Sequence, residues 1–188
     1  MRRIPFTPTL VAPAAPNRVP ATHRHSATGR NHMWALVAYL VVVVSHFIEH
    51  ATQIVQVHVL GWAPAQAGGF LGLWLPGLAM TEVLHTTYNT VQLAGLAALL
   101  SGFKGPARRW WLAALMIQCW HLFEHLLLQV QFLTGHHLMS HAKQHSLLEL
   151  VFPRVELHFA YNLLVFVPTV VATVIYLYSR RSQNSEAS

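Results

Sequence analysis

The sequence predicts an all-α integral membrane protein of four transmembrane helices, built as two parallel two-helix repeats with both termini in the cytoplasm. Of its 188 residues, 54% are hydrophobic and only 10% are charged, too few charges for an ordinary soluble surface. Four apolar stretches can each supply the roughly 20 residues that cross a bilayer: residues 33–60, 76–100, 109–134 and 148–178. In addition, the pattern His-x-x-Glu-His occurs twice, at residues 46–50 and 121–125, with an offset of 75 residues.

The chain divides into four expected regions. Residues 1–32 are rich in Pro and Arg and contain no acid, which predicts a disordered cytoplasmic leader. Residues 33–102 and 103–180 are the two predicted helical-hairpin repeats, and residues 181–188 are a predicted disordered tail. Because Lys and Arg gather before the first helix, between the second and third, and after the fourth, the positive-inside rule places both termini in the cytoplasm.

Local signals define each helix in turn. The first is expected to begin near Trp34 and to end near residue 61. The second begins at Pro76, because proline is favoured at the first helical position, and ends at residue 102. The third opens with the interfacial pair Trp110 and Trp111 and ends at residue 135. The fourth carries Pro153 in its first turns and ends before the basic pair at residues 180–181.

A second motif follows each copy of the first. His-x-x-Tyr-Asn occurs at residues 85–89 and 158–162, with an offset of 73 residues. Ionisable side chains inside membrane helices are costly and are functional by default. Since residues three and four apart share one helix face, the four motifs are expected to converge in the outer half of the membrane. The chain also has no Asp, and four of its six Glu fall in the expected spans.

Imidazole and carboxylate side chains together predict a metal site. The candidate ligands are His46, Glu49, His50, Glu82, His85, His121, Glu124, His125, Glu156 and His158. Four carboxylates would balance two divalent ions, which favours a dinuclear site like that of the di-iron four-helix bundles, with iron preferred and zinc, manganese or copper as alternatives. Glu49 and Glu124 are expected to bridge metals or to act as bases. Tyr88 and Tyr161 are candidate proton donors or radical sites.

The string His-x-x-Glu-His resembles the inverzincin motif of zinc peptidases, in which the two histidines bind zinc and the glutamate is the base. That resemblance would assign those roles to His46, Glu49 and His50, or to the copy at residues 121–125. In this chain the strings are transmembrane and duplicated, which indicates shared spacing rather than the same fold. Membrane desaturases and hydroxylases also group histidines near four membrane helices, but with other spacings and on the cytoplasmic side.

Three classes of function follow from these patterns. The leading hypothesis is a metal-dependent membrane oxidoreductase or hydroxylase that takes electrons from a redox partner or a quinol, because the chain has no nucleotide-binding fingerprint. The first alternative is a haem b electron-transfer protein, with His50 paired to His85 and His125 paired to His158. The second is metal or proton transport, or a metallochaperone for a larger membrane enzyme. Nearly apolar inner helix halves favour a pocket that opens to one side.

The remaining expectations concern partners and single residues. The net charge of +6 is explained by topology and by contact with anionic lipid in a bacterial plasma membrane, and it requires no nucleic-acid partner. His58 is interpreted as an interhelical contact. Arg154 is expected to neutralise Glu149 or Glu156. The histidines of residues 136–145 are equally compatible with metal capture and with a solvated loop.

Overall fold

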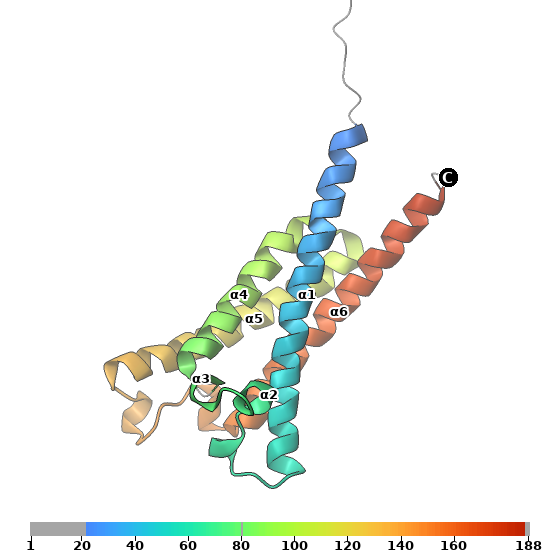
Figure 1. The fold of residues 1–188 in the computed structure, drawn as a ribbon. Coiled ribbons are helices and arrows are strands. Elements are labelled where there is room, and N and C mark those ends of the chain that lie inside the picture. The colour runs from blue at the N-terminus through green and yellow to red at the C-terminus, as the bar shows by residue number, and fades with distance from the viewer. Residues whose placement is uncertain (1–21, 80, 187–188) are drawn as a thin grey trace, which may run out of the picture.

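The computed structural model describes residues 22–79 and 81–186, and within these ranges the chain is helical and has no strand. Four long helices form a bundle: α1 (Thr22–His58), α4 (Glu82–Leu99), α5 (Gly105–Thr134) and α6 (Arg154–Glu186). The connections carry six short helices: η1 (Pro64–Gln66), α2 (Gly69–Gly72), α3 (Pro76–Ala79), η2 (Leu100–Gly102), η3 (Leu138–Ser140) and η4 (Leu148–Leu150). Helix α1 begins and α6 ends at one end of the bundle, the terminal end, while residues 59–79 and 135–153 form the opposite, loop end (Figure 1).

Three helices are long and apolar enough to cross a membrane, namely residues Gly29–His58, Gly105–Thr134 and Arg154–Gln183. Their outward surface is apolar: Val41 is 64% exposed and Met116 is 67% exposed. Polar side chains lie inside instead, with Gln118 and His125 both 0% exposed. In water this distribution would be unfavourable, but it suits a protein surrounded by lipid. The predicted all-helical, membrane-compatible class is therefore confirmed for the described residues.

The expected second span is interrupted. Helix α3 ends at Ala79 and α4 begins only at Glu82, with Thr81 as the N-cap residue whose hydroxyl accepts the backbone N–H of Leu84 at 3.3 Å. This cap satisfies a donor that a new helix leaves open, which favours a break at that position. The 18 residues of α4 extend about 27 Å. The Thr, Asn and Gln residues of α4 lower its hydropathy. The expected second span, and with it the arrangement of four spans in two repeats, therefore stays a prediction.

Part of each expected disordered end is helical in the structure. Helix α1 begins at Thr22, so residues 22–32 of the predicted leader belong to it, and α6 continues to Glu186. Arg180 donates to the backbone oxygen of Gly29 at 3.5 Å and thereby connects the two helices beyond the apolar run. Composition predicts how a segment is hydrated but not whether its backbone stays helical. Residues 1–21 and 187–188 of these regions lie outside the described residues.

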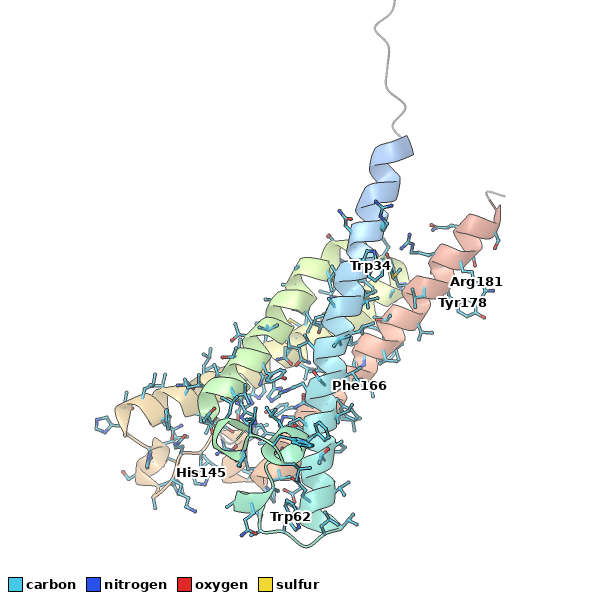
Figure 2. All side chains as sticks on the ribbon, viewed as in Figure 1. Trp34, Trp62, His145, Phe166, Tyr178 and Arg181 are labelled. Atoms are coloured by element: carbon cyan, nitrogen blue, oxygen red, sulfur yellow. The ribbon has the colours of Figure 1, made fainter. Side chains whose placement is uncertain are left out.

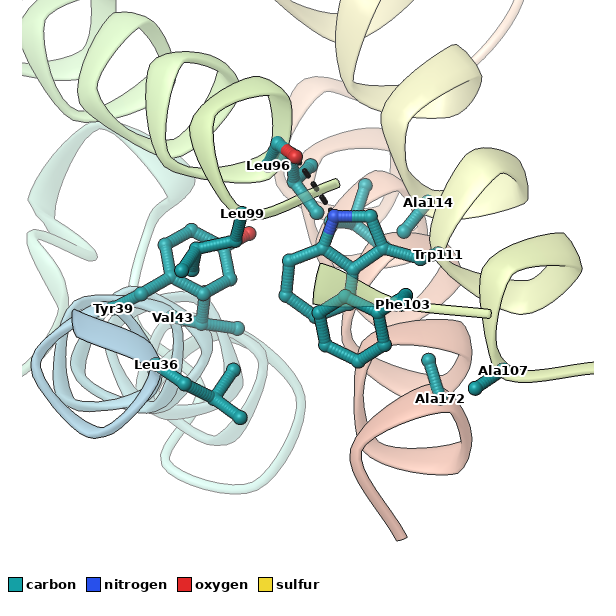
Figure 3. Packing of buried hydrophobic residues seen from close by; sticks show 11 residues of the cluster. Leu36, Tyr39, Val43, Leu96, Leu99, Phe103, Ala107, Trp111, Ala114 and Ala172 are labelled. Atoms are coloured by element: carbon teal, nitrogen blue, oxygen red, sulfur yellow. Dashed lines mark hydrogen bonds between the residues drawn. The ribbon is translucent and has the colours of Figure 1, made fainter. Parts of the chain in front are cut away.

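An aromatic core closes the terminal half of the bundle (Figure 3). Phe103 stacks on Trp111 with ring centroids 3.9 Å apart, and the Trp111 indole N–H donates to the Leu96 backbone oxygen at 2.7 Å. Tyr39 of α1 lies 5.6 Å from Trp111 and directly over Gly95, where a Cβ atom would collide with the tyrosine ring. The buried histidines and glutamates lie instead in the loop half, where the candidate site is found.

The side-chain view places aromatic residues at both ends of the bundle. Trp34, Tyr178 and Arg181 lie at the terminal end, and Trp62 and His145 lie at the loop end (Figure 2). Trp34 is 68% exposed and Tyr178 is 76% exposed. Tryptophan and tyrosine commonly anchor membrane proteins at the boundary between hydrocarbon and water. Their positions here are consistent with a bilayer between the two ends.

Candidate metal centre

All six histidines of the four sequence motifs lie together where the long helices meet. Neighbouring imidazole rings have centroids between 4.8 and 5.9 Å apart, both within α1 and α5 and between the four long helices. Five of the six are buried, and His85 is half-buried: His46, His50, His85, His121, His125 and His158. Burying this many imidazoles is costly unless their nitrogen atoms are bound. The cluster therefore calls for a ligand or a hydrogen-bonding role.

Three of these histidines have the spacing of a metal site. One nitrogen from each of His121, His125 and His158 lies within 4.8 Å of the other two. The Nε2 atoms of His121 and His125 are 3.2 Å apart. Two imidazole nitrogens bound tetrahedrally at about 2.0–2.1 Å from one ion would be about 3.3 Å apart. These three side chains can therefore hold a metal ion.

Hydrogen bonds orient the histidine of each His-x-x-Tyr-Asn motif in the same way. The Nδ1 atom of His158 lies 2.8 Å from the Arg154 backbone oxygen, and that of His85 lies 2.9 Å from the Thr81 backbone oxygen. Because a carbonyl oxygen only accepts, Nδ1 carries the proton in both rings. Nε2 is then left with its lone pair available to a metal. This is the usual arrangement of a metal-binding histidine.

The asparagine and tyrosine of that motif also have defined roles. The Asn89 and Asn162 side chains donate to the backbone oxygens of His85 and His158, each at 2.9 Å. Tyr88 stacks on His46 at 4.9 Å between centroids, and Tyr161 stacks on His121 at 4.6 Å. Each motif thus supplies one inward imidazole, and its tyrosine covers a histidine of a neighbouring helix.

The two tyrosines differ in one contact that sequence reasoning missed. The indole N–H of Trp120 donates to the Tyr161 hydroxyl at 2.7 Å, and Trp120 is 43% exposed on the outer surface. Trp120 lies outside the repeated sequence motifs, directly before the second His-x-x-Glu-His. At the matching offset of 75 residues the first repeat has Ser45. That difference was the available signal that the two halves are not equivalent.

Glu49 and Glu124 accept hydrogen bonds from the backbone of the segments that connect the long helices. The backbone N–H of Leu71 donates to Glu49 at 2.8 Å, and that of Leu148 donates to Glu124 at 3.3 Å. Each glutamate therefore secures the connection that follows its own helix. The Oε1 atom of Glu124 is buried without a hydrogen-bond partner among the described residues. Their role as metal bridges or bases stays a prediction.

Glu156 lies apart from the six histidines. Its carboxylate is 2.8 Å from Nε2 of His58, and the two side chains are 39% and 52% exposed. This pair joins α1 to α6, in agreement with the interpretation of His58 as an interhelical contact. Glu156 is off the inward face of α6 because it precedes His158 by two residues rather than by three or four. The contact with His58 does not bring Glu156 into the predicted ligand set.

Glu82 is the predicted carboxylate that approaches the ligands most directly. Its Oε2 atom lies 3.9 Å from Nδ1 of His125, and its Oε1 atom is paired with Arg154. Arg154 also pairs with Glu149 at 3.3 Å. The Oε1 atom of Glu149 in turn lies 3.7 Å from Nδ1 of His158. Arg154 thus links two carboxylates beside two candidate ligands. Its predicted pairing with Glu149 agrees with the structure, while Glu156 pairs elsewhere.

Glu149 is a site residue that the sequence did not reveal as such. It lies in η4, outside the long helices, and its side chain is buried. Burial raises the pKa of the Glu149 carboxyl above its ordinary value, and the nearby Arg154 guanidinium opposes that change. Its backbone contact is with the N–H of Ser146, at 3.1 Å. Carboxylates beside metal-binding histidines commonly orient the rings and strengthen them as ligands.

A cavity of about 330 Å³ leads to the histidines from the loop end. Its wall includes three histidines and the charged pair described above: His50, His85, His158, Glu82 and Arg154. This size lies in the range of small-molecule sites. At the deep side of the cluster, Gln118 donates to the Asn89 side chain at 2.8 Å, and beyond it the aromatic core begins. The expected one-sided pocket is consistent with this arrangement.

Neither a protein-family model, nor a curated protein, nor a solved structure matches the chain. Its function is therefore inferred from the site itself.

Proposed function

We propose that this protein is a membrane metalloprotein that binds a transition-metal ion through His121, His125 and His158. The observation that carries the proposal is the convergence of three buried imidazole nitrogens within 4.8 Å of one another. The hydrogen bond from Nδ1 of His158 to a backbone oxygen supports it, because that bond directs the other ring nitrogen into the cluster. Buried imidazoles without bound partners would destabilise the bundle.

The donor set bears on the identity of the metal. Glu49 and Glu156 are engaged with the connection at Leu71 and with His58, which leaves imidazole as the dominant ligand near the centre. Imidazole suits zinc, copper, iron and nickel, whereas carboxylate-rich sites suit harder ions. The contacts therefore favour copper or zinc more than the sequence did, and they keep iron among the candidates. Manganese becomes the least favoured of the four metals named.

A second ion would be bound by His46, His50 and His85, in the first of two parallel hairpin repeats. The matched tyrosine stacks on His46 and His121 support such a two-fold arrangement. Besides the Trp120–Tyr161 hydrogen bond, a second contact distinguishes the halves, since the Gln53 side chain lies 2.8 Å from Nδ1 of His50. The residue at the matching offset is Leu128. We infer that the second hairpin holds the tighter site.

The finer proposal is a metal-dependent oxidoreductase or hydroxylase of the plasma membrane. A bound redox metal would supply electron transfer and Lewis-acid chemistry at the inner end of the cavity. Within the chain, the Tyr161 ring covers His121 and receives the Trp120 hydrogen bond, so this tyrosine is positioned next to a ligand. The cavity beside His85 provides room for a small substrate. Electrons would come from a redox partner or a quinol.

Haem binding is the first alternative. Its predicted pairs, His50 with His85 and His125 with His158, have centroids 5.9 and 4.8 Å apart. Other imidazoles pack against both pairs, so a planar macrocycle would require the rings to separate. This crowding favours a bare ion. For transport, the aromatic core at Phe103 and Trp111 stands across the terminal half of the bundle, which favours a site open to one side.

The test is elemental analysis and visible spectroscopy of the detergent-purified protein. One or two copper, zinc or iron ions per chain, without a Soret band, would support the metal centre. A redox-active metal would then favour the oxidoreductase, and zinc would favour hydrolysis or metal handling. A stoichiometric haem spectrum would replace this proposal with the electron-transfer alternative. A protein with neither metal nor haem, and with no affinity for added metal, would refute it.

A further inference from the structure

The connection from α5 to α6 carries four histidines and is held in a defined shape by one buried side chain. Gln131, at the end of α5, donates to the backbone oxygen of His145 at 2.8 Å. Its side-chain oxygen accepts the backbone N–H of Leu138 at 2.9 Å and that of His145 at 3.4 Å. Residues 138 and 145 are therefore secured to the same glutamine, which holds the backbone of the segment that carries His141 and ends at His145.

The other hairpin has a connection secured in the same manner but without histidine. Gln56 donates to the Gly69 backbone oxygen at 3.0 Å and accepts the Gly69 N–H at 2.9 Å. Residues 59–81 contain no histidine, whereas residues 135–153 contain four. Histidine is thus not required to shape a connection of this kind. Its enrichment over the second hairpin, beside His121, His125 and His158, calls for a separate explanation.

Two of the loop histidines have the separation expected when they share one ion. The ring centroids of His141 and His145 are 5.1 Å apart. Two imidazoles bound tetrahedrally at about 2.0–2.1 Å from an ion would have centroids about 5 Å apart. Nδ1 of His145 donates to the Lys143 backbone oxygen at 2.9 Å, and Nδ1 of His137 donates to the His141 backbone oxygen at 3.0 Å. In both rings Nε2 is therefore the available ligand atom.

The loop histidines and the inner centre are joined by adjoining cavities. A second cavity, of about 510 Å³, is lined by His137, His145 and Glu149, and Lys143 and Arg154 belong to the walls of both cavities. Figure 2 places His145 at the loop end of the bundle. Glu149 lies between the two groups, since its carboxylate is 3.7 Å from Nδ1 of His158. A carboxylate at this position can attract a cation as it passes inward.

We propose that His141 and His145, assisted by His137, form an acquisition site that captures a transition-metal ion and transfers it to His121, His125 and His158. This inference rests on the proposed function. The direction of transfer follows from the ligands: the outer site is exposed and has two imidazoles at binding separation, whereas the inner site is buried and has three. The outer site therefore binds more weakly and exchanges faster. The ion moves inward because it gains a ligand there.

The test is zinc uptake by the full-length protein in detergent after removal of metal with a chelator. Titration of the wild type with Zn²⁺ is expected to reveal a tight class and a weak class of sites. In the double variant His141→Ala/His145→Ala the weak class should be lost, and the tight class should fill at least about tenfold more slowly while reaching the same final content. His136→Ala is the matched control, because His136 belongs to the same loop but is outside the His141–His145 ring pair and, unlike His137 and His145, does not line the second cavity.

The possible results distinguish failure of the acquisition site from failure of the inner metal centre. A double variant that retains the weak class, or that fills the tight class at the wild-type rate, overturns the acquisition site while leaving the proposed function intact. A wild type without a tight class refutes the metal centre itself. The final content of the tight class also reports folding, because a folded variant loads fully when given time. If alanine disturbs the loop, His141→Gln/His145→Gln removes the same imidazoles with less change in side-chain volume and is judged by the same outcomes.

Discussion

Replacement of His158 by alanine should abolish tight metal binding, whereas replacement of His85 should not. The two residues occupy the same position of the repeated His-x-x-Tyr-Asn motif, and each donates from Nδ1 to the backbone oxygen four residues earlier. Only His158 belongs to the group of three nitrogens within 4.8 Å of one another. The two variants therefore lose the same local hydrogen bond but differ in whether they remove a ligand of the proposed centre.

The expected magnitude follows from the number of ligands. Structural zinc sites with four ligands bind with about 10–16 kcal/mol, or roughly 3 kcal/mol per ligand. Loss of one imidazole of three should therefore weaken binding by more than about 100-fold. His85 lies beside this group, with its ring centroid 5.8 Å from that of His125, so His85→Ala should alter the affinity of the tight site by less than about tenfold.

The assay is competition for Zn²⁺ against a chelator of known affinity, using detergent-purified wild type, His158→Ala and His85→Ala, with thermal unfolding measured on the same samples. Unchanged tight affinity in His158→Ala would refute the assignment of the centre to the second hairpin. A tight site lost only in His85→Ala would move the centre to His46, His50 and His85. Equal losses in both variants, with unfolding temperatures unchanged, would indicate one shared centre instead of two unequal ones.

Three further predictions concern pH and packing. Acidification from about pH 8 to about pH 5 should release the ion, because imidazole must be neutral to bind it. The measurement is the metal content of the protein after equilibration at each pH. Full retention of the ion at about pH 5 would argue against histidine ligands. Gly69→Ala should lower the unfolding temperature more than Gly61→Ala, because both glycines have positive φ but only at Gly69 would the added Cβ collide with a carboxylate. The collision should reduce the free energy of unfolding by about a further 1–3 kcal/mol. Equal shifts in the two variants would contradict the close packing at Gly69. Trp111→Phe should lower the free energy of unfolding by about 1 kcal/mol, because it removes the hydrogen bond from the indole N–H to a backbone oxygen. Trp110→Phe should leave the free energy of unfolding nearly unchanged, because Trp110 is 44% exposed. A larger loss in Trp110→Phe than in Trp111→Phe would contradict this reasoning.

The fold class could be predicted from composition because the bilayer imposes simple requirements. Helices must satisfy their own backbone hydrogen bonds, and about 20 apolar residues are needed to cross. Three of the four expected spans meet that test. The break before α4 was harder to foresee, since Thr81 is an unremarkable residue in an apolar run and becomes a cap only when the chain turns there. The start of α1 was predicted too late and the end of α6 too early. The reason is related, because a hydrophilic composition does not by itself end a helix.

The six histidines could be found from spacing alone, because residues three and four apart share a helix face whatever the tertiary arrangement. The carboxylates could not be assigned in this way. Whether Glu49 faces a metal or the N–H of Leu71 depends on how a segment 22 residues further along the chain folds back. Glu156 pairs with His58 because α1 and α6 lie side by side there. The position of Glu149 beside His158 likewise results from the packing of η4. Sequence determined which groups enter the bundle, and tertiary structure decided their partners, because hydrogen bonds and ion pairs depend on distances that only the packed helices fix.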